Sequence, residues 1–425
     1  MNNRGECQQM RDPQKSSHGV GSHGNSYRTP HLADPKRCTG CTACFTSCRY
    51  SAIQMLPDSL GCLRPVVDET LCLGCGLCER VCPSLSTFAS SLPLQCVAAK
   101  TKDRELLLKS SSGGLFTELA NSVLSSGGVV YGCVLDSGLR AVHVRAVAQE
   151  DLEPMRGSKY VQSDLKRTFS DALADLDAGR HVLFVGTPCQ IQGLTALIRG
   201  QDDNLITVAL ICHGAPTPAM FEHYKKSEEL SAGDKLINFG FRNKSISWRE
   251  FAISLGFENP AKNKIISQWS GSYMCLFNRN YLMRESCFHC PARRGRSGCD
   301  LMIGDYWGVE HAHPHIDSEK GVSCVLAYTE KGVRILKSLS VDCWETTYRQ
   351  IKKANKNIEG NPCRPFGIEY FRSNYSLKSF DEWTKWVFWG PWWFRPFCPV
   401  LHWAEFKATW VKDMYHKVRR AIFLE

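Results

Sequence analysis

The sequence lacks the features that would direct it into a secretory pathway, across a bilayer or onto a nucleic acid. Residues 1–33 have no apolar signal core and are rich in small and polar residues, so we expect a disordered lead-in. Residues 383–423 hold seven of the eleven tryptophans but no run of about eighteen uncharged apolar residues free of proline, which excludes a membrane span there. The net charge of +10 is dispersed without a recognition motif. Acidic electron-transfer partners or anionic cofactors explain that charge as well, and we expect no nucleic-acid partner.

Cysteine, by contrast, is abundant, with 22 in 425 residues. Such a number, spread along a long chain in C-x2-C repeats, argues for metal ligation in a reducing compartment rather than for secreted disulfides. It predicts a cytoplasmic protein. The Trp, Lys and Arg interleaved near the carboxyl terminus also allow peripheral membrane association or partner docking, the alternative being that these aromatics cap the domain.

Two cysteine runs share the spacing C-x2-C-x2-C-x3-C. They are Cys38, Cys41, Cys44 and Cys48, and Cys72, Cys75, Cys78 and Cys82. This spacing is typical of bacterial-type 4Fe-4S clusters, in which the fourth cysteine of each run binds the other cluster. We therefore predict two 4Fe-4S clusters, one completed by Cys82 and the other by Cys48. Zinc sites or disulfides are the alternative, but structural zinc usually takes two separated ligand pairs.

The two runs differ in the residue that follows them. Pro83 follows the second run, whereas Arg49 follows the first. A positive charge beside one cluster would raise its potential, so the two clusters are expected to be distinguishable.

The remaining pattern predicts an α+β ferredoxin-like module followed by an α/β catalytic domain with a mixed sheet. Buried-type strands at 182–186 and 205–211 each end in a short loop that enters a helix, an order typical of parallel α/β cores. We divide the chain into a lead-in (1–33), a two-cluster module (34–90), a linker (91–108), a catalytic domain (109–345) and a Trp-rich basic extension (346–425).

The stretch Ser110-Ser111-Ser112-Gly113-Gly114 precedes an amphipathic helix that ends at Gly127. Backbone N–H groups, hydroxyls and the positive end of the helix dipole would form a seat for a pyrophosphate. The alternative is an ordinary Ser N-cap with Gly beside it.

Six motifs together resemble the beta subunit of the coenzyme F-420 (deazaflavin) hydrogenase and dehydrogenase, in the version with an amino-terminal two-cluster module. They are Ser111-Ser112-Gly113-Gly114, Arg156-Gly157-Ser158-Lys159-Tyr160-Val161-Gln162, Gly186-Thr187-Pro188-Cys189-Gln190, Cys212-His213-Gly214, the Cys287/Cys290/Cys299 set and Gly304-Asp305-Tyr306-Trp307-Gly308. The resemblance covers about residues 34–345. It implies FAD, at least one further 4Fe-4S cluster and electron transfer between a two-electron donor, such as reduced coenzyme F-420, and one-electron carriers.

The resemblance also implies the site residues. Those expected to bind cofactor are Ser110, Ser111, Ser112, Gly113, Gly114, Arg156, Lys159, Tyr160, Thr187, Gln190 and Asp305. Lys159 and His213 are the candidate catalytic residues, although solvated charge and a hydrogen-bonded core histidine are the ordinary explanations.

A third 4Fe-4S cluster would use Cys287, Cys290 and Cys299, which supply three thiolates in a positive setting. Cys189 is the candidate for the fourth ligand and Cys212 the reserve, with a zinc site as the alternative.

Three functional hypotheses follow. The first is a complete oxidoreductase that contains FAD and three clusters and acts on a small-molecule redox substrate. The second is an electron-relay subunit that serves ferredoxin or another electron-transfer protein within a larger complex. The third is a ferredoxin-dependent reductase of a sugar, lipid or tetrapyrrole-type substrate.

Overall fold

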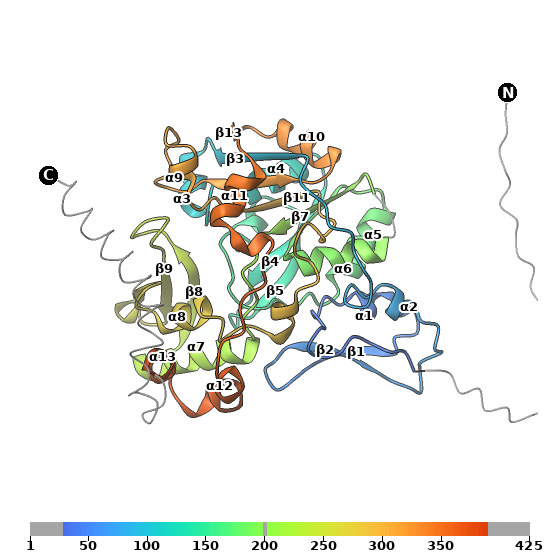
Figure 1. Cartoon of the computed structure of the whole chain (residues 1–425), viewed down its shortest axis with the longest axis horizontal. Coiled ribbons are helices and arrows are strands. Elements are labelled where there is room, and N and C mark those ends of the chain that lie inside the picture. Colours follow the sequence, from blue (N-terminus) through green and yellow to red (C-terminus); the bar gives the residue numbers. More distant parts are fainter. Residues whose placement is uncertain (1–28, 199–201, 390–425) are drawn as a thin grey trace, which may run out of the picture.

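The structure is a computed structural model that describes residues 29–198 and 202–389 (Figure 1). Most of the expected lead-in (1–33) and the extension beyond residue 389 lie outside the described residues. Among the described residues, no helix combines the length and the apolar character that a bilayer span requires.

One mixed sheet of eight strands forms the centre of the molecule, in the order β13-β3-β12-β11-β7-β6-β4-β5. Its strands are β3 (Gln95–Thr101), β4 (Val129–Leu135), β5 (Ala141–Ala146), β6 (Val182–Gly186), β7 (Leu205–Leu210), β11 (Leu301–Asp305), β12 (Ser323–Ala327) and β13 (Val341–Glu345). The four strands β11, β7, β6 and β4 run parallel, and the strands on either side of them pair antiparallel. This confirms the predicted α/β domain with a mixed sheet.

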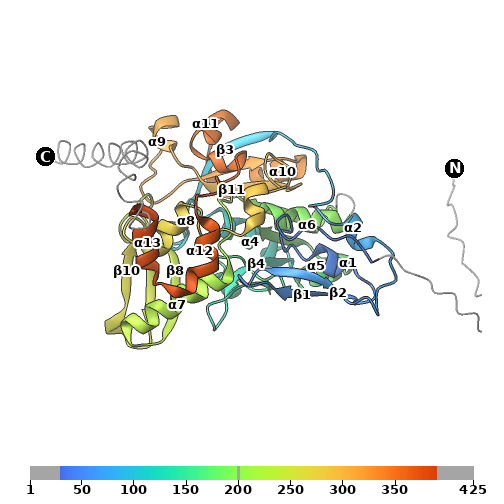
Figure 2. The same cartoon turned by 60° about the horizontal axis from the view of Figure 1, so that its bottom comes forward.

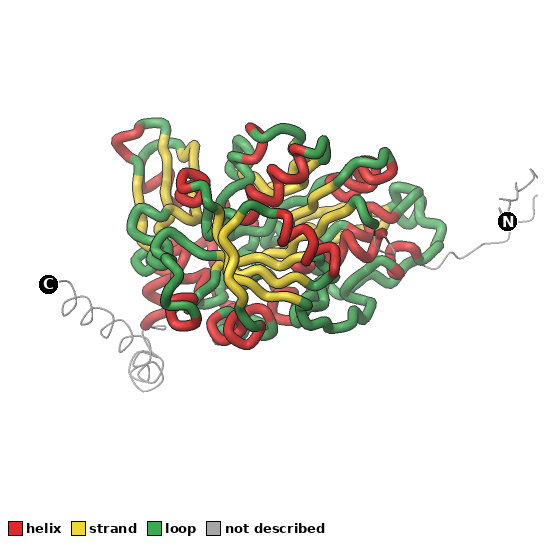
Figure 3. The backbone as a smooth tube through the Cα atoms, turned by 90° about the horizontal axis from the view of Figure 1, so that it is seen from above, coloured by secondary structure: helices red, strands yellow, loops and turns green. Residues whose placement is uncertain are grey.

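Helices cover both faces of this sheet (Figure 3). On one face, α4 (Leu115–Ser125) and α10 (Glu330–Ser338) bury apolar residues; Leu115, Leu119 and Val123 of α4 recur every fourth residue and so share one helix face. On the other face, α5 (Thr168–Asp177), α6 (Pro188–Ile198) and α11 (Tyr348–Ala354) do the same. Short helices α3 (Arg104–Lys109) and α9 (Val309–Ala312) complete this part.

A smaller antiparallel sheet stands beside the large one, in the order β10-β9-β8. Its strands are β8 (Leu236–Asn243), β9 (Ala252–Phe257) and β10 (Lys264–Ser267). An aromatic-rich core joins it to α7 (Pro218–Ala232), α8 (Ser272–Asn278), α12 (Ile368–Asn374) and α13 (Phe380–Trp389), which gather around it in Figure 2.

The amino-terminal module contains the hairpin of β1 (Ile53–Pro57) and β2 (Leu63–Val67) and two short helices, α1 (Ala43–Ser47) and α2 (Leu77–Arg80). In both cysteine runs the glycine of the first gap has a positive φ, +67° at Gly40 and +63° at Gly74. Glycine adopts this conformation without a steric cost, and it turns the loop tightly, as the motif predicts.

The module packs on α6 of the large domain. A Cβ atom on Gly193 would lie 2.8 Å from both Cβ and Sγ of Cys41. Glycine at this position therefore lets the helix approach the cysteine loop.

The structure differs from the predicted division of the chain at two places. The expected linker, 91–108, contains β3 and α3, and β3 pairs with β12 on one side and β13 on the other. A short apolar run beside a cysteine-rich module gives no sign that it enters a sheet built from later residues. In the expected extension, α11 to α13 pack against the catalytic domain, and Trp383 is fully buried. Trp383 therefore packs within the domain, as the alternative to membrane or partner docking expects.

A buried ion pair joins the two sheets. Arg242 of β8 donates to both carboxylate oxygens of Asp305 at the end of β11, at 2.8 and 3.2 Å. The Arg242 side chain is 1% exposed, and its guanidinium stacks on Phe251 at 4.1 Å from the ring centre. The indole N–H of Trp248 donates to the same carboxylate at 2.9 Å.

Replacing Asp305 by Asn should lower the free energy of unfolding by about 3–5 kcal/mol, because the Arg242 charge stays buried without a counter-ion. Glu258→Gln is the matched control, since Glu258 pairs with Lys235 at 3.9 Å on an exposed surface and should cost under about 1 kcal/mol. Urea unfolding measures both. Equal losses would show that the pair does not hold the sheets together.

Replacing Gly193 by Ala should weaken docking of the amino-terminal module, because the added methyl group overlaps Cys41. Overpacking of this kind costs about 1–3 kcal/mol, partly offset by the better helix propensity of Ala. Protease resistance of the module and the melting temperature of the whole chain measure the effect. Thr195→Ala, two residues further along α6, is the control. A Gly193→Ala chain as resistant as the control would contradict the tight contact.

Candidate functional site

A cavity of about 830 Å³ opens at the carboxyl ends of the parallel strands, where ligands bind in open α/β sheets. Its walls include the ends of β6, β7 and β11, the serine–glycine loop before α4, the loop of residues 156–163 and part of the smaller sheet. Thr39 and Gly40 of the amino-terminal module reach it as well. The cavity is therefore shared by all parts of the fold, and its volume lies in the upper part of the range for ligand sites.

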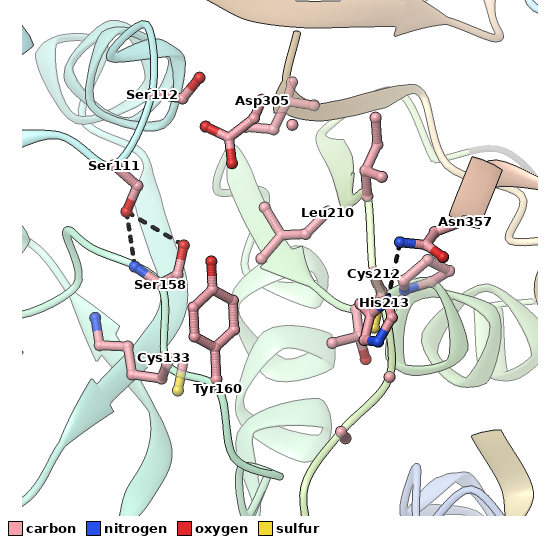
Figure 4. A pocket seen from close by; sticks show the side chains of 18 of the residues that line it. Ser111, Ser112, Cys133, Ser158, Tyr160, Leu210, Cys212, His213, Asp305 and Asn357 are labelled. Atoms are coloured by element: carbon pink, nitrogen blue, oxygen red, sulfur yellow. Dashed lines mark hydrogen bonds between the residues drawn. The ribbon is translucent and has the colours of Figure 1, made fainter. Parts of the chain in front are cut away.

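Figure 4 shows this cavity with Ser111, Tyr160, Leu210 and Asp305 around it. The hydroxyl of Ser111 accepts hydrogen bonds from the backbone N–H and the hydroxyl of Ser158, at 2.8 and 3.2 Å. These bonds connect the serine–glycine loop to the loop of residues 156–163, which is distant in the sequence.

The remaining contacts of the serine–glycine loop fix its backbone. Arg242 donates to the carbonyl of Ser111 at 3.1 Å, and Lys244 donates to the carbonyl of Ser112 at 3.1 Å. Gly113 has no room for a side chain, because a Cβ atom there would lie 2.4 Å from the carbonyl oxygen of Ala99. Its N–H donates to Ser323 at 2.9 Å. The loop is thus a rigid platform rather than a mobile flap.

The hydroxyls of Ser110 and Ser112 form hydrogen bonds within the protein. Ser110 donates to the carbonyl of Leu106 at 2.7 Å, and Ser112 donates to that of Val322 at 3.0 Å. The start of α4, unlike these hydroxyls, has no side-chain partner. Gly114 takes the N-cap position with φ +86°, and no side chain caps the first turn. The first N–H groups of a helix have no partner within it. Gly114, Leu115 and Phe116 line the cavity, so the free helix end faces it.

Lys159 is not a free catalytic amine. Its ammonium donates to the carbonyls of Pro154, Met155 and Arg156 at 2.8, 2.9 and 2.8 Å. Burial lowers the pKa of Lys159 to about 8, while the three carbonyl acceptors favour the charged form. The side chain therefore holds the loop that carries Arg156, whose guanidinium lies 3.3 Å from the hydroxyl of Thr117 on α4.

The contacts of His213 are those of a hydrogen-bonded core histidine rather than of a catalytic group. Nδ1 lies 3.1 Å from the amide nitrogen of Asn357, and Nε2 lies 2.8 Å from the amide oxygen of Asn280. Burial and the nearby Arg293 lower the pKa of the imidazole. Both ring nitrogens are engaged, which favours a neutral, fixed ring over a proton donor.

Thr187 and Gln190 form the junction between β6 and α6. The side-chain oxygen of Gln190 accepts from the N–H and the hydroxyl of Thr187 at 2.8 and 3.0 Å, and its amide donates to Ser163 at 2.9 Å. The hydroxyl of Thr187 also lies 3.3 Å from Sγ of Cys189. These residues orient Cys189 at the floor of the cavity.

Four cysteines gather at this floor: Cys189, Cys212, Cys287 and Cys290. Burial raises the pKa of Cys287 to about 11 and that of Cys290 to about 12, and Arg293 opposes the shift in both. The N–H of Ala215 donates to Sγ of Cys287 at 3.3 Å. A bound metal would hold such thiols as thiolates.

Cys299 lies apart from this group. It precedes β11, at the opposite end of the strand from the cavity, where the Ser297 hydroxyl donates to its sulfur at 3.2 Å. Burial raises its pKa to about 12, and Asp300 adds to the shift. The structure thus brings Cys189 and its reserve Cys212 together with Cys287 and Cys290, and leaves Cys299 out.

One of the two crossed cysteine groups that the spacing predicts comes together in the structure. Cys38, Cys41, Cys44 and Cys82 line one small cavity. Burial raises the pKa of Cys41 to about 12, and its neighbours Cys38 and Cys82 add to the shift. On the other side, Cys48 packs against the hydrophobic cluster that contains Cys78, and Cys75 is exposed.

Within 29–198 and 202–389, no three or more Cys, His, Asp or Glu side chains converge closely enough to hold a single metal ion. A 4Fe-4S cluster does not need such convergence, because each of its four cysteines binds a different iron. No disulfide links any of the cysteines in these residues.

Sequence reasoning missed several residues of the site, among them Arg242, Lys244, Asn280, Arg284 and Asn357. Each is a single polar residue in a strand or loop without a motif around it. Strict alternation along the strand at 236–243 would place Arg242 on the face opposite Phe239 and Phe241, so the sequence could predict neither its burial, which accompanies a register shift between Gly240 and Asn243, nor Asp305 as its partner.

Three family models match the chain. The model of a 4Fe-4S dicluster domain matches residues 37–85. The models of the amino-terminal and carboxyl-terminal parts of the coenzyme F-420 hydrogenase/dehydrogenase beta subunit match residues 96–169 and 179–350.

Two curated proteins are similar over long stretches. One subunit of the F(420)H(2) dehydrogenase of Methanosarcina mazei is 23% identical over 188 residues, which are 41% of this chain and 53% of that protein. The match therefore spans about half of that relative's length. An uncharacterised protein of Methanocaldococcus jannaschii is 22% identical over 341 residues, 70% of this chain and 85% of that protein.

Among solved structures, a chain of the F-420-reducing nickel–iron hydrogenase complex from Methanosarcina barkeri is similar, with 18% identity and a TM-score of 0.45. The similarity covers 64% of this chain and 91% of that one. On the family models and the sequence relatives, the chain belongs to the family of coenzyme F-420 hydrogenase/dehydrogenase beta subunits and carries a 4Fe-4S domain at its amino-terminal side.

Proposed function

We propose that this chain is an iron–sulfur flavoprotein oxidoreductase that passes electrons between a two-electron hydride carrier of the deazaflavin type and one-electron carriers. One observation supports this most directly. A single cavity meets an uncapped helix end, a group of four half-buried cysteines and the first cysteine loop of the amino-terminal module.

FAD fits the residues of the cavity. The free end of α4 offers N–H groups and a positive dipole to a pyrophosphate, and Arg156 lies on the same wall. Leu210, Phe251 and Trp307 supply apolar surface for a ring system. Bound there, FAD would supply the exchange between two-electron and one-electron chemistry that hydride carriers and clusters cannot perform together.

The third cluster is proposed to use Cys189, Cys212, Cys287 and Cys290. The N–H of Ala215 and the hydroxyl of Thr187 already lie within reach of two of the sulfurs, and hydrogen bonds to sulfur raise the potential of a cluster. Cys38, Cys41, Cys44 and Cys82 would hold the next cluster.

The fourth group, Cys72, Cys75, Cys78 and Cys48, would hold the outermost cluster. Leu71 and Leu73 beside it are exposed by 49% and 43%, and Cys75 is exposed as well. This face is the proposed docking place for a one-electron partner protein or subunit.

The experiment that tests the function is anaerobic purification with flavin release and iron counting, followed by flavin reduction with reduced deazaflavin, NAD(P)H and reduced ferredoxin in turn. We expect one flavin and roughly twelve irons per chain, with bleaching by the deazaflavin. A chain with about four irons and no flavin would refute the proposal.

Replacing Ser111 by Asp should weaken FAD binding at least tenfold, or about 1.4 kcal/mol, because the new carboxylate competes with the pyrophosphate for the end of α4. Ser111→Ala removes the hydroxyl without adding charge, and its loss should be smaller. Flavin fluorescence on dilution gives both dissociation constants. If the Asp variant binds flavin as tightly as wild type, the pyrophosphate does not bind at this end of α4.

Replacing Cys212 by Ser should remove roughly four irons per chain, whereas Cys299→Ser should keep them all. Cys299 is the more deeply buried of the two residues, so general damage to the fold would affect its variant at least as much. Iron counting and electron paramagnetic resonance of the dithionite-reduced proteins distinguish the outcomes. Iron loss confined to Cys299→Ser would restore the ligand set expected from the sequence spacing.

A further inference from the structure

Arg284 carries a buried positive charge that has no carboxylate partner among the described residues. The residue is 3% exposed, and none of the ion pairs formed within the described residues includes it. One terminal nitrogen donates to the carbonyl of Cys38 at 2.6 Å. Nε and the other terminal nitrogen are buried without a partner.

The guanidinium lies against the first cysteine loop. An added Cβ on Gly40 would be 2.9 Å from the otherwise unpartnered terminal nitrogen. Gly40 has φ +67° and stands between Cys38 and Cys41, so the glycine both turns the loop and admits the arginine.

The backbone of Arg284 belongs to the other cysteine group. Its carbonyl accepts from the N–H of Cys287 at 3.1 Å, and its own N–H donates to Ala215 at 3.0 Å. The N–H of Ala215 in turn donates to Sγ of Cys287. Arg284 thus spans the boundary between the Cys287 group and the Cys38 group.

Two other arginines near the cysteines make different contacts, and Arg293 keeps one buried nitrogen, Nε, without a partner. Arg64 also donates to the carbonyl of Cys38, at 3.1 Å, but pairs with Asp58 at 3.0 Å. Arg293 directs its terminal nitrogens to the carbonyls of His213 and Asn357. Arg284 differs in having two buried donors without a partner, one of which lies beside Gly40 of the cysteine loop.

An isolated buried cation costs several kcal/mol, and breaking a buried pair is strongly destabilising. A fold that keeps such a cation needs a negative charge beside it. A 4Fe-4S cluster with four thiolate ligands supplies that charge, and its potential depends on nearby charge and hydrogen bonds. The unpaired nitrogens of Arg284 are therefore what a neighbouring cluster would satisfy.

We propose that Arg284 is the shared counter-ion of two adjacent clusters, those of the Cys38 and the Cys287 groups. The inference rests on the proposed function, because it requires both clusters. The arginine is a positioning residue: it stabilises the added electron on either cluster, reduces the repulsion between them and holds the loop of one module against the other. Helix α6 supports the same junction, since Cys189 and Gly193, the latter against Cys41, lie one helical turn apart.

The test is an anaerobic redox titration of the full, cluster-loaded chain, followed by electron paramagnetic resonance. In Arg284→Met, the equilibrium constant for one-electron reduction of at least one cluster should fall tenfold or more, a shift of 59 mV for a one-electron couple. Arg284→Lys keeps the charge and should stay within threefold of wild type.

The matched control is the double variant Arg64→Met with Asp58→Asn. It removes the neighbouring hydrogen bond to the Cys38 carbonyl without changing the net charge, and Asn keeps the side-chain oxygen that accepts from the N–H groups of Leu60 and Cys62. Its potentials should stay within threefold of wild type. If the double variant shifts as much as Arg284→Met, the hydrogen bond rather than the charge is responsible, and the inference is wrong.

Further outcomes distinguish a failure of the Arg284 inference from a failure of the proposed function. Unchanged potentials in an iron-replete Arg284→Met chain, or lowered flavin affinity with unchanged potentials, would overturn the inference and leave the proposed function standing. Wild-type protein without iron would overturn both. If Arg284→Met loses a cluster, Arg284→Lys decides: a retained cluster with near-wild-type potential supports the inference, and a lost cluster or a lowered potential refutes it.

Discussion

The buried ion pair of Arg242 and Asp305 is the constraint on which the cavity depends. Arg242 comes from the smaller sheet and Asp305 from the end of β11, and the same guanidinium reaches the carbonyl of Ser111 and the hydroxyl of Tyr160 at 3.1 and 3.2 Å. A single charged group thus fixes four walls of one site. Because both charges of the pair are largely removed from solvent, their geometry is tightly specified, and this fixes the smaller sheet against the end of β11.

The parallel strands and the helix α6 determine where the cysteines lie. Parallel strands end at a common edge, so the first turn of α6 after β6 and the loop after β7 bring Cys189 and Cys212 together. Helix α6 then starts at the cavity and carries Gly193 to Cys41 of the amino-terminal module. The proposed clusters therefore follow from one strand–helix unit of the large domain, with Arg284 at the boundary between them.

Many elements could be predicted because their signals are local. The strand Val182–Gly186, the helix that begins after Gly114 and the crossed cysteine runs each depend on residues close in sequence. The position of β3 between β12 and β13 could not, because its partners come more than two hundred residues later. Cys299 shows the same limit: its nearness in sequence to Cys290 suggested a shared site, yet it stands at the amino end of β11, away from the edge where the other cysteines meet.

The sequence by itself indicated the chemistry: the spacing of eight cysteines specifies iron–sulfur ligation, and the serine–glycine loop before an amphipathic helix predicts an anion seat. Tertiary structure decided which side chains are free to act on a ligand. Lys159 and His213 look reactive in the sequence, but folding commits the first to three carbonyls and the second to two asparagines. Arg284, which no motif marks, is left buried with free donors. The physical reason is that burial and hydrogen-bond partners, unlike spacing, are set by residues far apart in the chain.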